Sequence, residues 1–302
     1  MAGSTTEPHA VARRLLDTGP SDYAPWFDRD ACAAVIANHG LPIIRSEAWQ
    51  HTNVGRWYET VLDAPRPTHG DAVWESPDEV VVRDFADART ANLFGPRQTF
   101  DLERYPLAAV NGLLLGGGLA IRVPAGCQAS GPVRISRLPS AYQHCLVSVE
   151  AGATLELIEE PSPHTHRIVE AVVHEGAVLR HHRRQAAAAS RECTLVGVNV
   201  AAGGRYELSQ LSLGADLRRN DILVTLAGAG AETVLRSAWR VDGRGHLDNQ
   251  VAVEHALPGG TSRQTYRGVA AGRARTVLNG RIHIAPGAQH SDATLSTKNL
   301  LA

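Results

Sequence analysis

The sequence of 302 residues contains only four cysteines, and they form no C-x-x-C pair. Structural zinc sites and dithiol redox sites usually depend on such pairs, so neither kind of site finds support. Free cysteine is among the residues most often buried in proteins. We therefore expect reduced thiols that act as small buried hydrophobic side chains at Cys32, Cys127, Cys145 and Cys193.

An excess of charge of either sign is also missing. The 30 Lys and Arg residues nearly balance the 31 Asp and Glu residues, so no global field would draw the chain to nucleic acid or to an anionic membrane. No apolar run approaches the roughly 18 residues of a membrane span, and the opening MAGSTTEPHAVARRLL has no apolar signal region. We expect a cytoplasmic protein that binds neither nucleic acid nor membrane.

Motifs for nucleotide binding and for common catalytic sites are lacking too. The run GGGLA at 116–120 has the glycines of a phosphate-binding loop but neither its lysine nor a following helix, and G-x-S-x-G and H-E-x-x-H do not occur. The sequence therefore predicts no catalytic residue. A carbohydrate-active or carbohydrate-binding β-helix protein is the alternative, but the aromatic content of 5% and the lack of paired acidic residues count against it.

The first part of the sequence, residues 1–61, predicts a small helical region. Ser21 can cap a helix that Gly40 and Pro42 then stop, and a shorter helix is expected at 11–17. Three aromatic side chains downstream are expected to anchor this region against a neighbour: Trp49, Trp57 and Tyr58.

A segment rich in proline, aspartate and glycine at 62–71 predicts a linker, which with its continuation forms the entry to the core at 62–109. From 110 to 302, short alternating apolar runs are separated by glycine-rich turns.

The turn glycines recur at a nearly regular interval. Gly152, Gly176, Gly203 and Gly230 are separated by 24, 27 and 27 residues. A β-sandwich would place turns about every 8 to 12 residues, whereas a solenoid in which each strand stacks on its counterpart in the next rung explains the longer unit. The sequence predicts a mainly β fold, a parallel β-helix with imperfect rungs.

Histidine is the one enriched titratable residue type. His164 and His166 are two apart, which on a strand would place both imidazoles on one face and allow a metal to bind; His181 and His182 would point to opposite faces. Exposed polar side chains are the favoured interpretation, because two ligands make a weak site.

The polar segment GHLDNQVAVEHALPGGTS at 245–262 offers further acid, base or ligand types, and a polar ladder or a contact surface is the favoured interpretation. Weak candidate metal ligands are therefore His164, His166, His246 and His255.

Several longer stretches resemble one known family. RSEAWQHTN, VNGLLLGGGLAIRVPAG and the ordered run from RNDILVTLAG at residue 219 to the C-terminus are similar to the SufB/SufD family of iron–sulfur cluster assembly proteins, and SufD is the closer match. The resemblance implies a right-handed parallel β-helix core with a helical region on its N-terminal side. It also implies a non-catalytic scaffold subunit that pairs with a SufB-like subunit, in a complex energised by the SufC ATPase.

The family's H-x-D-N pattern falls on His246, Asp248 and Asn249, and its late strands are where subunits join edge to edge. The resemblance therefore implies pairing with a SufB-like subunit or with a second copy through the C-terminal rungs. The residues expected at that interface are Asn279, Arg281, His283, Gln289, Asp292 and Asn299.

The sequence departs from the family pattern in and after this stretch. Leu295 and Thr297 stand where the family usually has Gln and Asn, and His290 replaces a usual Lys. Family members continue into a C-x-H-G-A-T-like segment and into helices that bind SufC, and neither has a counterpart in this sequence. We expect SufC docking to be lost and no stably bound cofactor, with iron or an iron–sulfur cluster held transiently in the assembled complex.

Overall fold

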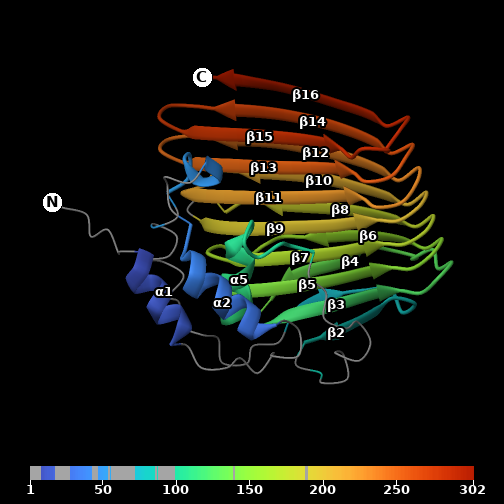
Figure 1. Cartoon of the computed structure of the whole chain (residues 1–302), viewed down its shortest axis with the longest axis horizontal. Helices are drawn as coiled ribbons and strands as arrows, with labels where there is room; N and C mark the ends of the chain where they lie inside the picture. The colour runs from blue at the N-terminus through green and yellow to red at the C-terminus, as the bar shows by residue number, and fades with distance from the viewer. Residues whose placement is uncertain are drawn as a thin grey trace.

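The computed structural model describes residues 8–17, 28–42, 47–53, 55, 72–85, 87, 99–138, 140–187 and 190–302. Most of these residues belong to two eight-stranded sheets that face each other, and the chain passes from one sheet to the other at every turn (Figure 1). The result is a parallel β-solenoid of about seven turns. This confirms the predicted mainly β fold with a β-helix core.

The two sheets, called sheet A and sheet B, take alternate strands of the chain. Sheet A contains, in spatial order, β1 (Val73–Glu75), β4 (Val133–Arg137), β6 (Thr154–Glu159), β8 (Val178–Gln185), β10 (Arg205–Leu213), β12 (Glu232–Val241), β14 (Thr261–Ala270) and β16 (Asp292–Leu301). Sheet B contains β2 (Val81–Asp84), β3 (Gly118–Val123), β5 (Tyr142–Val149), β7 (His166–Val173), β9 (Arg191–Val200), β11 (Leu217–Leu226), β13 (His246–His255) and β15 (Arg275–Ile284). Neighbouring strands are parallel except in the pairs β1–β4 and β2–β3.

The predicted turn glycines sit at equivalent positions of successive rungs. Gly152, Gly176, Gly203 and Gly230 all have φ between +59° and +66°, a conformation that residues with a Cβ rarely adopt. Each donates its N–H to a carbonyl in the corresponding turn of the next rung, over 2.8 to 3.0 Å. The 24- to 27-residue spacing is thus the length of one rung.

The solenoid interior is filled by alternate residues of each strand. On β6 the inward side chains of Leu155 and Leu157 are fully buried, while their neighbours are partly exposed. Val, Leu and Ile from both sheets form one continuous cluster along the described rungs, joined by the buried rings of Tyr206 and Tyr266. The predicted alternation therefore forms the core.

A second hydrophobic cluster joins the helical segments to the outer face of sheet B (Figure 1). It includes side chains from three α-helices, the 3₁₀-helix η2 and strands β5, β7, β9 and β11. Helix α5 packs directly against β5 and β7. The helical elements are α1 (Pro8–Leu16), α2 (Arg29–His39), η2 (Glu47–Trp49) and α5 (Pro106–Leu114).

Helix α2 begins later than the sequence predicts. Its N-cap is Asp28, whose carboxylate accepts a hydrogen bond from the N–H of Ala31 at 2.9 Å, so the prediction of a cap at Ser21 is wrong for this helix. Gly40 does end it, with φ +71° and an N–H bonded to Ile36 O. Ser21 itself lies outside the described residues.

Two of the predicted anchors, Trp57 and Tyr58, also lie outside the described residues, as does the linker at 62–71. Within the predicted entry segment 62–109, β1 and β2 add to the first strands of the two sheets, and α5 crosses its boundary at residue 110. No helix among the described residues is both long and apolar enough to cross a bilayer.

Candidate functional site

The last rung leaves two strand edges open. In the described structure β15 ends sheet B and β16 ends sheet A, and each is paired on one side only, with β13 and β14 respectively (Figure 1). Both are ten residues long and largely exposed. Since the unpaired backbone of an edge strand recruits further strands, this rung is the candidate site for pairing with another chain.

The hydrogen-bond pattern shows which backbone groups of β16 face its open edge. Asp292 and Ala302 donate their N–H groups to Gly260 O and Ala270 O in the rung below, each over 2.9 Å. Successive residues of a strand in a parallel sheet bond to opposite sides, so the residues between them alternate. Those with N–H groups facing the open edge are Ala293, Leu295, Thr297, Asn299 and Leu301.

The same reasoning applies to β15. The N–H of Arg275 bonds to Gly245 O at 2.9 Å, and that of Ala285 bonds to His255 O at the same distance. Odd-numbered residues of β15 therefore bond to β13, and even-numbered residues from 276 to 284 face the open edge. The odd-numbered residues contribute to this surface through their side chains.

All six predicted interface residues lie on or next to this last rung. Three are on the outer face of β15, one is in the following turn and two are on β16: Asn279, Arg281, His283, Gln289, Asp292 and Asn299. Their side-chain contacts within the chain include a hydrogen bond from Asn279 to Gln250 at 2.9 Å and longer ion pairs, of 3.6 Å from His283 to Glu254 and 3.9 Å from Asp292 to Arg263. Whether they touch a partner stays a prediction.

The histidine pair does not form the predicted site. His164 has φ +57° and lies in the turn before β7, whereas His166 is the first residue of that strand and is fully buried. The prediction that both share one face of a strand is wrong, because the strand begins after His164. Burial lowers the pKa of His166 to about 3. His181 and His182 do point to opposite faces of β8, inward and outward.

The other two candidate metal ligands also lie far from each other. His246 and His255 are the first and last residues of β13, nine residues apart, which is about 30 Å on a strand. His246 Nε2 lies 3.2 Å from Thr52 Oγ1, and His255 Nε2 lies 2.9 Å from Ser262 Oγ. Among the residues that the structure describes, no three His, Cys, Asp or Glu side chains gather into a metal site.

The thiols match the expectation of burial at three of four positions. Cys32, Cys145 and Cys193 are buried, and Cys127 is partly exposed. Burial raises the pKa of Cys32 and of Cys145 to about 12. The thiolate form that binds metals is therefore disfavoured at both positions.

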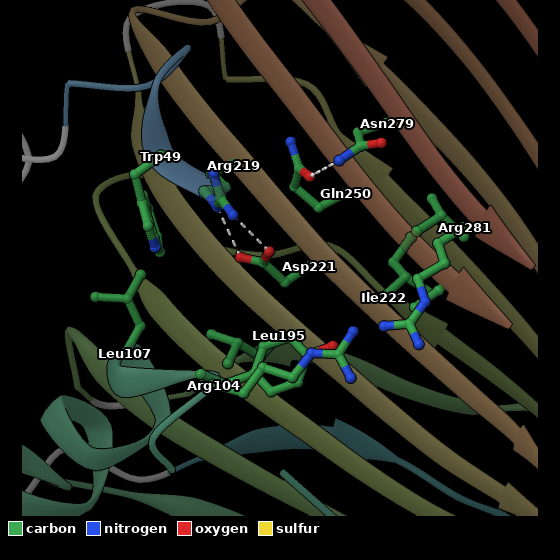
Figure 2. Close-up of a pocket in the computed structure, with 13 residues that line it drawn as sticks. Trp49, Arg104, Leu107, Leu195, Arg219, Asp221, Ile222, Gln250, Asn279 and Arg281 are labelled. Carbon is green, nitrogen blue, oxygen red and sulfur yellow. Dashed lines mark hydrogen bonds and ion pairs between the residues drawn. The ribbon is translucent and has the colours of Figure 1, made fainter. Parts of the chain in front are cut away.

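Asp248, from the H-x-D-N pattern, ties the helical region to the solenoid. Its carboxylate accepts hydrogen bonds from the Thr52 hydroxyl and, at 3.0 Å, from Arg219 Nη1. Arg219 also makes a two-pronged ion pair with Asp221, over 2.8 Å at each contact, and its guanidinium lies 3.5 Å from the centre of the Trp49 ring (Figure 2). Burial raises the pKa of Asp221, although the Arg219 charge opposes this.

Asp248→Ala is expected to lower the free energy of unfolding by about 2–3 kcal/mol, because it removes charge-assisted bonds and leaves a buried guanidinium less well satisfied. Urea denaturation measures the loss. Glu254→Ala, on the same strand and exposed, is the matched control and should cost less than about 1 kcal/mol. Equal losses in the two variants would show that Asp248 does not hold the helical region in place.

A cluster of charged side chains lies inside the solenoid, where the sequence predicts apolar residues. Glu159 accepts hydrogen bonds from Arg183 Nε and, at 2.9 Å, from Arg167 Nη1, and all three side chains are fully buried. The imidazole of His181 lies 3.4 Å from the same carboxylate. Burial opposes ionisation of Glu159, but the two guanidinium groups hold its pKa well below the usual range.

Further rungs continue this polar interior. Arg218 pairs with Glu192 over 3.0 Å, and Asn220 donates to Asn249 at the matching position of the next rung over 2.9 Å. Sequence reasoning missed these residues because charged side chains are seldom fully buried. The sequence did contain one indication of a buried polar face. In the strand LRHHRRQ every second residue points inward, so His181, Arg183 and Gln185 share the inward face with Leu179.

Comparison with known proteins places the solenoid in a known family. The family model described as the SUF system FeS cluster assembly, SufBD core domain, matches residues 134–302, more than half of the chain. The chain belongs to this family and thus to the SUF system of iron–sulfur cluster assembly. Among curated proteins, none matches the chain. The family match does not favour the carbohydrate-active alternative.

Proposed function

We propose that the chain is a SufD-like, non-catalytic scaffold subunit of iron–sulfur cluster assembly. It pairs through its last rung with a SufB-like subunit or with a second copy, in a complex energised by the SufC ATPase. Iron or a cluster is held transiently in that complex rather than as a stable cofactor. The absence of a P-loop motif supports assigning ATP hydrolysis to the partner, and the SufD-like stretch from residue 219 supports the choice of subunit.

The observation that carries this proposal is the open edge of β15 and β16. Two ten-residue strands with unpaired backbone on one side offer a ready template for strand addition, and side chains on both faces supply selectivity. Pairing of this kind depends on N–H groups at alternate positions rather than on any one side chain.

Thr297→Pro is expected to weaken strand pairing with a partner at least tenfold. The substitution removes an N–H that faces the open edge of β16 and places the proline ring at that edge. The ladder to β14 keeps its bonds, so the fold of the isolated chain should survive. Dissociation constants for a SufB-like partner and for self-association, measured by analytical ultracentrifugation, test this. A tenfold change corresponds to about 1.4 kcal/mol.

Thr297→Ala is the matched control, since it also removes the side chain but keeps the N–H. It should change the dissociation constant less than about threefold, a range below 1 kcal/mol. If the alanine and proline variants bind the partner equally well, β16 is not the pairing edge.

A further inference from the structure

A pocket of about 150 Å³ lies on the outer face of sheet B, beside the last rung (Figure 2). Trp49 comes from η2, and Arg104, Tyr105 and Leu107 come from the start of α5 and the two residues before it. Strands β9, β11, β13 and β15 supply the rest of the wall. A water molecule occupies about 30 Å³ in the liquid, and pockets for drug-sized ligands begin at about 300 Å³. The pocket therefore suits a ligand of only a few non-hydrogen atoms.

Three arginines and one carboxylate line the pocket. The carboxylate, Asp221, already accepts two hydrogen bonds from Arg219, which also pairs with Asp248, so Arg219 adds no uncompensated positive charge to the pocket. Arg104 and Arg281 remain, and in the described structure neither has a carboxylate within ion-pair distance. The charge that the pocket offers to a ligand is therefore positive.

The two arginines approach the pocket from different parts of the chain. The guanidinium of Arg104 lies 5.5 Å from the centre of the Tyr105 ring, just before α5, while Arg281 projects from the outer face of β15. Both charges, with that of Arg219, act to lower the pKa of Tyr105, which burial raises. The two guanidinium groups therefore border the same small space.

The hydrogen-bonding groups of the pocket are mainly donors. A guanidinium has five N–H donors in a planar fork, a shape that matches carboxylate and phosphate oxygens. Asn279 uses one amide hydrogen to bond Gln250 Oε1 at 2.9 Å, which leaves its second amide hydrogen for a ligand. The apolar side chains of Leu107 and Leu195, which belong to the cluster on the outer face of sheet B, would exclude water from one side of a bound group.

We propose that this pocket binds a small oxyanion, a phosphate or a carboxylate, between Arg104 and Arg281. The proposal does not depend on the proposed function. Arg281 is also one of the predicted interface residues, but its backbone bonds to β13 and not at the open edge of β15. In the unpaired chain its side chain borders the pocket and can bind the ligand.

Isothermal titration calorimetry of the full chain at constant ionic strength tests the proposal, with inorganic phosphate in one arm and acetate in the other. We expect saturable binding of at least one anion. Arg104→Gln and Arg281→Gln should each weaken it about tenfold or more, since charge-assisted bonds are worth about 1.5–3 kcal/mol. The arm that binds more tightly identifies phosphate or carboxylate as the preferred group.

Arg184→Gln is the matched control, because it removes the same charge from the exposed outer face of sheet A. It should change the affinity less than about twofold, which is under 0.5 kcal/mol. Arg104 and Arg281 are exposed, so these two variants should unfold at the temperature of the parent chain. No saturable binding of either anion at millimolar concentration, or equal weakening by Arg184→Gln, would overturn the proposal.

Discussion

Glu159→Gln is expected to lower the free energy of unfolding by about 3–5 kcal/mol, because it leaves two buried arginines without their shared counter-charge. Arg167 and Arg183 keep their bonds to Gln143 and Gln210, of 2.8 and 2.7 Å, but those amides carry no charge. A typical domain is stable by only about 5–15 kcal/mol, so the loss is a large share of the total. Guanidinium-induced unfolding followed by circular dichroism measures it.

Glu156→Gln is the control for this substitution. Glu156 lies on the same strand but faces outward, with 46% of its side chain exposed and His182 at 3.5 Å. An exposed pair of this kind contributes about 0–1 kcal/mol. A loss below about 1 kcal/mol in Glu159→Gln as well would mean that water reaches the interior cluster and screens its charges.

The second large effect is expected on acidification, at His166. Its pKa is about 3 in the folded chain and 6.5 when unfolded, because burial beside Tyr142 disfavours the charged ring. Below pH 6.5 the unfolded state binds a proton that the folded state does not, so stability falls as pH falls, by about 1.4 kcal/mol per unit. At a pH about two units lower the loss is about 3 kcal/mol.

Urea denaturation at about pH 7 and about pH 4.5 tests this in parent and His166→Gln chains. The variant should lack about 3 kcal/mol of the pH dependence, whereas His182→Gln, at an exposed position, should keep it. The pKa of Glu159 is lowered by folding from 4.5, so its contribution is lost only at lower pH and does not interfere. Identical profiles for all three chains would contradict a neutral buried His166.

The repeat was predictable because it depends on local chemistry. A turn with positive φ needs glycine, so Gly152 and its counterparts mark each rung in the sequence before any strand is paired. The location of the last rung follows from the same count. Asn279 and Asn299 therefore fall on the final strands of both sheets, as expected.

The errors arose where tertiary contacts decide the outcome. Whether His164 belongs to a strand or to a turn depends on where β7 starts to pair with β5, which two alternating histidines do not reveal. The pocket between Arg104 and Arg281 joins segments 177 residues apart along the chain, so no local pattern could indicate it. The start of α2 was misplaced because Ser21 and Asp28 are both good capping residues.

The column of turn glycines makes the rungs nearly interchangeable in shape, and apolar side chains alone would tolerate a strand stacked on the wrong neighbour. The buried ion pairs remove that freedom. If β8 skipped β6 during folding, Arg183 would enter the interior without Glu159, at a cost of several kcal/mol. The buried charges therefore specify which rung stacks on which.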